Sequence, residues 1–156
     1  MKQSPLGLLV LGSVLILAAC APRASTASES SVPIKPGETY ILEVRGLQIA
    51  KGNRFTLTVG NQLERRTTLG RDWFFVTARP ITAAARGANF NYYPDRQTLS
   101  VVVMLDAAVS NNQASRLEVL YCDLKQGQDG WTGTANYDAS LKDKTLKDGT
   151  CTLRRT

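Results

Sequence analysis

This sequence contains no histidine. Histidine is the usual general base at neutral pH and the commonest metal ligand of proteins. Its absence excludes nucleophilic sites of the Ser–His or Cys–His type, in which an imidazole takes the proton from the nucleophile. Zinc is also disfavoured, because two thiols without histidine do not supply the four ligands that it prefers.

Other signals of catalysis are missing as well. No glycine-rich loop of the kind that cradles a phosphate group is present. Two carboxylates can in principle run glycoside hydrolysis. The candidate acids, however, are scattered along the chain: Glu64, Asp72, Asp95 and Asp106. We therefore expect no catalytic site, no metal ion and no cofactor, and a protein that is not an enzyme.

The N-terminal residues have the organisation of an export signal. One positive charge, Lys2, precedes the apolar run 6–17 (LGLLVLGSVLIL). This run is too short to span a bilayer, which takes roughly 20 residues, and its length is typical of a signal peptide. It ends in Leu17-Ala18-Ala19-Cys20, which resembles the lipobox of bacterial lipoproteins. The alternative is an ordinary secretory signal followed by a chance cysteine.

The resemblance covers about the first twenty residues and has definite implications. It implies a signal peptide over residues 1–19 and a lipid-modified Cys20 as the mature N-terminus. A lipobox cysteine carries at least two acyl chains, and two chains hold a protein stably on a membrane whereas one holds it marginally. The expected location is the cell envelope, on a membrane. Ala21, rather than Asp, favours the outer membrane under the sorting rule of enterobacteria.

The next segment has the composition of a spacer. Residues 21–38 (APRASTASESSVPIKPGE) are rich in Ser, Ala, Thr and Pro and offer little to bury, which is typical of a flexible linker. A first strand hidden at Val32-Pro33-Ile34 is the alternative, disfavoured by the prolines that flank it. The predicted organisation is a signal peptide at 1–19, a lipidated cysteine and linker at 20–38, and one domain at 39–156.

The chain has three cysteines, an odd number for an exported protein. Lipidation of Cys20 would leave Cys122 and Cys151, which we expect to form a disulfide in an oxidising compartment. Closing a loop of about 30 residues would stabilise the fold by roughly 3.5 kcal/mol in the chain-entropy model. We expect Trp131 to pack in the core beside this bond.

From residue 39 onward the sequence predicts an all-β domain. Short runs rich in β-branched and aromatic residues, several of them alternating with period two, are separated by Gly, Asn and Asp. Such spacing is typical of a small antiparallel sandwich or barrel of about seven to nine strands. The predicted strands are Thr39–Arg45, Arg54–Val59, Leu63–Leu69, Trp73–Ala78, Ala88–Tyr93, Thr98–Asp106, Ser115–Asp123, Gly130–Tyr137 and Thr150–Arg154.

Turn residues predict where the strands reverse. A three-residue loop at 60–62, beginning with Gly60-Asn61, would set Val59 opposite Leu63 in a hairpin. Further turns are predicted at 126–130 and at Asp148-Gly149. Little helix is expected, and the charged segment around 141–148 and residues 81–88 are read as loop or connector.

The candidate binding residues form a basic and aromatic stretch. The whole chain carries a net charge of +6, and its arginines concentrate between residues 65 and 86. Arginine forks bind carboxylates and phosphates, and aromatic rings stack on planar ligands or sugars, so the stretch is a candidate site for an anionic lipid, a glycan or an envelope protein. The alternative is a solvated sheet face whose arginines protect an edge strand. The candidate residues are Arg65, Arg66, Arg71, Arg79, Arg86, Tyr92 and Tyr93.

These features predict a membrane-anchored envelope lipoprotein with a non-catalytic β domain for interaction or structure. The alternative is a domain that binds or carries a small molecule, lipid or glycan. A filled interior would favour the first function, and an interior with empty space would favour the second. The envelope compartment disfavours nucleic acid as the partner.

Overall fold

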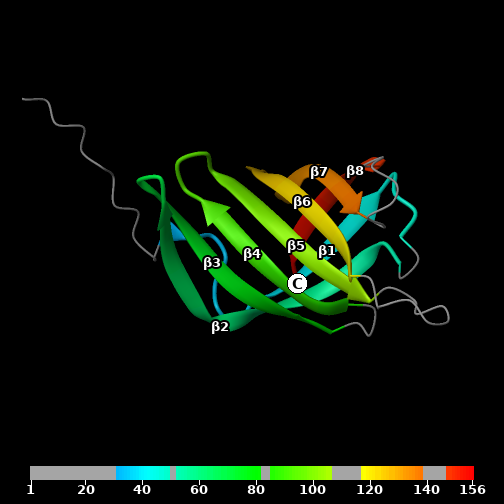
Figure 1. Cartoon of the computed structure of the whole chain (residues 1–156), viewed down its shortest axis with the longest axis horizontal. Coiled ribbons are helices and arrows are strands. Elements are labelled where there is room, and N and C mark those ends of the chain that lie inside the picture. Colours follow the sequence, from blue (N-terminus) through cyan, green and yellow to red (C-terminus); the bar gives the residue numbers. More distant parts are fainter. Residues whose placement is uncertain (1–30, 50–51, 82–84, 107–116, 139–146) are drawn as a thin grey trace, which may run out of the picture.

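The computed structural model describes residues 31–49, 52–81, 85–106, 117–138 and 147–156. These residues form one closed antiparallel barrel in which each strand pairs with the next and the first pairs with the last (Figure 1). The all-β prediction is confirmed, and the sheet is a barrel and not a sandwich. The strands are β1 (Thr39–Arg45), β2 (Arg54–Thr68), β3 (Arg71–Pro80), β4 (Ala85–Tyr93), β5 (Thr98–Asp106), β6 (Leu117–Gly127), β7 (Gly130–Asp138) and β8 (Lys147–Arg155).

The barrel is filled by its own side chains. Alternate residues of each strand point inward, and the inward positions of β5 are all aliphatic: Leu99, Val101, Val103 and Leu105 are each 0% exposed. The buried apolar residues of all strands form one cluster. Among the described residues no polar or charged side chain is buried. A barrel of eight strands is just wide enough for side chains to fill it, and this barrel has that arrangement.

Strand β2 corrects the hairpin predicted at Gly60-Asn61. The two predicted strands are one strand of 15 residues, and the pairing with β3 shifts register between Val59 and Leu63 in a bulge. Gly60 allows β3 to come close: an added Cβ would lie 2.8 Å from Thr77 Oγ1 and 2.9 Å from the Thr77 carbonyl oxygen. The glycine is therefore required by close packing at a bulge and not by a turn.

The turn predicted at Asp148-Gly149 is also wrong, because both residues lie inside β8. A Cβ on Gly149 would lie 2.5 Å from the Arg45 carbonyl oxygen and 2.6 Å from Leu47 Cγ. Here too a glycine that looks like a turn residue marks a close approach of the backbone. The turn predicted at 126–130 is confirmed, since β6 ends at Gly127 and β7 begins at Gly130. Residues 141–146 and 82–84 of the predicted loops lie outside the described residues. The loop prediction is wrong for residues 85–88, which belong to β4, and for residues 147–148, which belong to β8.

A disulfide joins Cys122 of β6 to Cys151 of β8, as the cysteine count predicted. Strand β7 lies between these two strands, yet the two Cα atoms are 6.1 Å apart. Strands two positions apart in a flat sheet are about 9.5 Å apart, so the sheet folds sharply at β7. Gly133 permits this fold, because a Cβ there would overlap the Asp123 carbonyl oxygen.

Residues 31–38 belong to the barrel rather than to a spacer. Val32 and Ile34 are 2% and 1% exposed and are part of the core. The Gly37 amide donates to the Val59 carbonyl at 3.0 Å, and the Tyr40 hydroxyl donates to the Glu38 carboxylate at 2.5 Å. The linker predicted from composition is therefore too long at its C-terminal end. Residues 1–30, including Cys20, lie outside the described residues.

The two ends of the barrel differ. The tight β2–β3, β4–β5 and β6–β7 connections lie at one end, which we call the hairpin end. The segment that precedes β1, blue in Figure 1, lies at this end as well. No helix among the described residues is long and apolar enough to cross a membrane.

Candidate functional site at the hairpin end

The seven candidate residues do not form one surface. Arg65 pairs with Phe74 and lies on the inward side of β2, whereas Arg66 pairs with Trp73 and lies on the outward side.

Arg79 and Arg86 lie near the opposite end of the barrel, because β3 ends and β4 begins there. The predicted patch of five arginines is therefore wrong as a single surface. The structure keeps Arg66 and Arg71 together and adds Arg96, as described below.

The two tyrosines are likewise separated. Tyr92 pairs with Leu99 and points inward, where its ring meets Trp131 edge to face at 6.2 Å. Burial raises the pKa of the Tyr92 hydroxyl. Tyr93 points outward and stacks on Trp73 of the neighbouring strand, with ring centroids 6.0 Å apart and 20° between the planes. Of these two tyrosines, Tyr93 is the one on the outer face of the barrel.

Aromatic rings and guanidinium groups alternate across the outer face of β2, β3 and β4. The Arg66 guanidinium lies 4.0 Å from the Phe75 ring centroid and 5.3 Å from the Trp73 ring centroid. Trp73 stacks on Tyr93, and the Arg96 guanidinium lies 4.6 Å from the Tyr93 ring centroid. Each such cation–π contact contributes about 0.5–1 kcal/mol at an exposed site. The contacts hold the rings in fixed orientations at the surface.

An unusual turn projects above these rings. Leu69 and Gly70 connect β2 to β3, and both have positive φ, 50° and 72°, as in a type I′ turn. This turn favours Asn-Gly or Asp-Gly, and a leucine in the left-handed region is strained. Leu69 is nevertheless 97% exposed. Its side chain therefore has no packing role in the described structure that would offset the strain.

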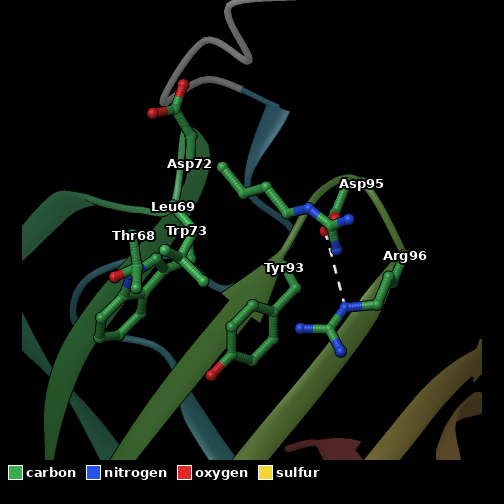
Figure 2. A pocket seen from close by; sticks show the side chains of 8 residues that line it. Thr68, Leu69, Asp72, Trp73, Tyr93, Asp95 and Arg96 are labelled. Carbon is green, nitrogen blue, oxygen red and sulfur yellow. Dashed lines mark hydrogen bonds and ion pairs between the residues drawn. The ribbon is translucent and has the colours of Figure 1, made fainter.

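A surface pocket lies between the β2–β3 and β4–β5 connections (Figure 2). Its volume is about 520 Å³. Figure 2 shows Tyr93 between Trp73 on one side and Asp95 and Arg96 on the other. The residues that line the pocket are Thr68, Leu69, Arg71, Asp72, Trp73, Tyr93, Asp95 and Arg96. We call these residues, together with Arg66, the tip surface.

The charges of the tip surface are partly paired. Arg71 and Arg96 lie 3.6 Å and 3.8 Å from the carboxylate of Asp95. Both ion pairs are long and exposed, so each contributes little, and each guanidinium keeps donors for another anion. Asp72 is held more tightly: hydrogen bonds from Arg65 and Thr67 lower the pKa of its carboxyl group. The geometry can therefore receive an anionic or amphipathic ligand beside flat aromatic rings.

The sequence did not single out Trp73 or Leu69 as site residues. Trp73 and Phe75 are two residues apart in β3, so their side chains point to the same side of the sheet. Their contacts with Arg66 and Tyr93 on the neighbouring strands show that this side is the outer one. A Leu-Gly pair between two strands was a weak signal, because it lacks the Asn or Asp that type I′ turns favour.

The described residues hold no group of three or more His, Cys, Asp or Glu side chains placed to bind a metal ion. Two of the acids considered for hydrolysis form ion pairs with arginine: Glu64 lies 2.6 Å from Arg66, and Asp95 lies between Arg71 and Arg96. No protein-family model, curated protein or solved structure matches this chain.

Proposed function

We propose that this chain is a lipid-anchored protein of the bacterial cell envelope, and that its barrel is a non-catalytic interaction domain that acts through the tip surface. The filled interior is the observation that carries this proposal. The buried side chains that fill the interior are apolar and at most 7% exposed, so the core leaves the outer surface as the place for a partner.

The same observation weighs against a carrier. A barrel that carries a small molecule needs an interior lined by side chains that do not meet. Here the interior rings of Tyr40 and Phe90 are 5.8 Å apart, and those of Tyr92 and Trp131 are 6.2 Å apart. Rings at such distances are in contact. The disulfide adds further atoms to the same core.

The tip surface is the best candidate for the interaction. Its aromatic rings and arginines are the residue types most enriched where proteins meet their partners. Its pocket and its projecting Leu69 lie at the end of the barrel where the N-terminal segment begins. A protein anchored by its N-terminus would hold this end close to the membrane.

Fractionation of cells that express the full chain tests the anchor. Wild type should remain in the membrane fraction after a high-salt wash, and Cys20→Ser should be released or remain unprocessed. Equal fractionation of both proteins would overturn the anchor. Native mass spectrometry of the detergent-extracted protein tests the carrier alternative: a mass equal to that of the acylated chain is expected, and a stoichiometric bound small molecule would contradict the interaction domain.

A further inference from the structure

We propose that the tip surface docks on the lipid bilayer itself, next to the anchor: Leu69 reaches the acyl chains, Trp73 and Tyr93 enter the headgroup region, and Arg66, Arg71 and Arg96 contact lipid phosphates. This proposal rests on the proposed function, because the lipid on Cys20 would bring the surface to the membrane. It adds the identity of the partner and a fixed orientation of the barrel.

Leu69 is the first argument. Its backbone has a positive φ, a conformation that is strained for a leucine, and its side chain is 97% exposed. An apolar side chain kept in a strained position at the apex of a hairpin, without a contact to offset the strain, is a candidate for function. Transfer of a leucine side chain from water into an apolar medium is favourable. Insertion of the Leu69 side chain into lipid would therefore offset the backbone strain of the turn.

The two rings below Leu69 suit the boundary between water and lipid. Trp73 and Tyr93 each combine an apolar ring with a polar group, and such rings are enriched at the level of the headgroups. The Trp73 indole nitrogen donates to Thr68 Oγ1 at 3.1 Å, so its polar edge is satisfied before any contact with a membrane. The ring then meets the lipid without an unpaired donor.

Arginines surround the rings on two sides. Arg66 lies against Trp73 and Phe75, and Arg96 lies against Tyr93. Arg71 follows Gly70 at the start of β3 and is 73% exposed at its side chain. Guanidinium forks bind phosphate groups with two hydrogen bonds. These arginines would contact anionic headgroups while Leu69, at the apex of the hairpin, reaches the acyl chains below them.

The length and starting point of the N-terminal chain favour lipid over other partners. Ser31 begins the described segment, which lies at the hairpin end in Figures 1 and 2. Cys20 precedes Ser31 by eleven positions, a stretch that spans at most about 40 Å when fully extended. A short tether keeps the tip surface at a high effective concentration near the bilayer. Weak individual contacts are then sufficient for docking.

Quenching of tryptophan fluorescence by brominated lipid tests the contact. The chain has two tryptophans: Trp73 lies on the tip surface, and Trp131 is 6% exposed inside the barrel. The processed, acylated full chain is reconstituted in vesicles of phosphatidylcholine and phosphatidylglycerol, with and without bromine on the acyl chains. Brominated vesicles should quench the part of the emission that the Trp73→Phe variant lacks, and they should leave the emission of Trp73→Phe unchanged.

The Leu69→Asn variant separates docking from folding. Asparagine suits a type I′ turn better than leucine, so this variant should melt at the same temperature as wild type or higher. It should nevertheless lose the quenching of Trp73, whereas Leu69→Met should retain it. The double variant Arg71→Gln and Arg96→Gln should weaken quenching in vesicles with phosphatidylglycerol more than in vesicles of phosphatidylcholine alone.

The outcomes distinguish docking from anchoring. If the acylated wild type remains on the vesicles and Trp73 is not quenched, the docking proposal is wrong although the anchor stands. If the chain carries no acyl group, the unacylated protein is added to the same vesicles at low salt, and binding that Leu69→Asn abolishes would support docking alone. A change of Trp73 emission on isolated peptidoglycan, with none on vesicles, would identify a glycan as the partner and overturn the proposal.

Discussion

Strand β4 ends in two adjacent tyrosines that meet two tryptophans in opposite environments. Tyr92 faces inward and contacts Trp131 edge to face, and Tyr93 faces outward and stacks on Trp73. The centroid distances are nearly equal, 6.2 Å and 6.0 Å. Both pairs contain one tyrosine and one tryptophan, but Trp73 lies on the neighbouring strand β3, whereas Trp131 lies across the barrel on β7. The two pairs therefore differ in what surrounds the rings and in their contact with solvent.

The comparison separates stability from binding. In the inner pair, Trp131 belongs to the apolar core and Tyr92 packs against that core, so a missing ring leaves a cavity that its neighbours cannot fill. The outer pair lies between two guanidinium groups and borders a pocket. Removal of an outer ring would leave water in its place. The inner pair should therefore determine the free energy of unfolding, and the outer pair should determine what the surface binds.

The largest effect is expected for the tryptophans. Trp131→Ala should lower the free energy of unfolding by about 4 kcal/mol, the usual cost of deleting a buried tryptophan. Trp73→Ala should lower it by about 1 kcal/mol, because it removes a half-exposed ring and one cation–π contact. Urea unfolding of both variants measures the difference. Equal losses would mean that the outer pair is as important to the core as the inner one.

Removal of the disulfide should come next. The double variant Cys122→Ala and Cys151→Ala opens a loop with a sequence separation of 29. The chain-entropy model then predicts a loss of about 3.5 kcal/mol. Urea unfolding measures this loss, and the unreduced wild type is its reference. The tip surface is formed by β2, β3 and β4, so the quenching of Trp73 should survive in molecules that remain folded.

The inner tyrosine should also affect stability at high pH. Burial raises the Tyr92 pKa in the folded state, whereas in the unfolded chain the hydroxyl ionises near pH 10. The unfolded state therefore loses its proton first, and the stability that Tyr92 provides is present below about pH 10 and decreases above it. Tyr92→Phe should reduce this decrease. Burial raises the Tyr40 and Tyr137 pKa values too, so part of the decrease should remain.

Unfolding measured at intervals from pH 8 to pH 11 checks this prediction. The quantity to compare is the slope of the free energy of unfolding against pH, and not its value at neutral pH, because the substitution also removes a hydroxyl group. An identical slope in wild type and Tyr92→Phe would contradict a raised Tyr92 pKa.

The smallest effect on stability is expected at the apex of the outer surface. Leu69→Asn should raise the free energy of unfolding by about 0.5 kcal/mol, because asparagine adopts positive φ at a lower cost than leucine. Thermal unfolding measures the gain. A loss of stability would show that the Leu69 side chain has a stabilising contact in the folded barrel, and the argument from uncompensated strain would be wrong.

The sequence predicted the strands best where the apolar pattern is complete. The bounds of β1 and β5 agree with the predicted ranges, because alternation and turn residues coincide at their ends. Strand β2 was divided in two because Gly60-Asn61 resembles a turn. The close approach of Gly60 to Thr77 on β3 cannot be predicted from the residues around Gly60. The burial of Val32 and Ile34 was not predicted for a related reason. It depends on packing against the barrel, whereas the composition of the surrounding segment is polar.

The candidate site was predicted less well than the fold. A window of sequence places Arg65 beside Arg66, but period two sends them to opposite faces. The same window includes Arg79 and Arg86, although β3 carries the chain to the far end of the barrel between Arg71 and Arg79. Only the pairing of strands brings Arg96 and Tyr93 to Trp73. Surface sites of a barrel are assembled across strands, where single-sequence patterns carry little information.

The closure of the barrel by β1 and β8 also constrains the order of folding. The Thr156 amide donates to the Thr39 carbonyl at 3.0 Å across a separation of 117 residues. During synthesis, β1 can pair with β2 early but must wait for β8 on its other edge. Contacts so distant in sequence slow folding, and an unpaired strand edge invites pairing with another chain. Until β8 arrives, each nascent barrel is an open sheet that a second copy could complete in its place.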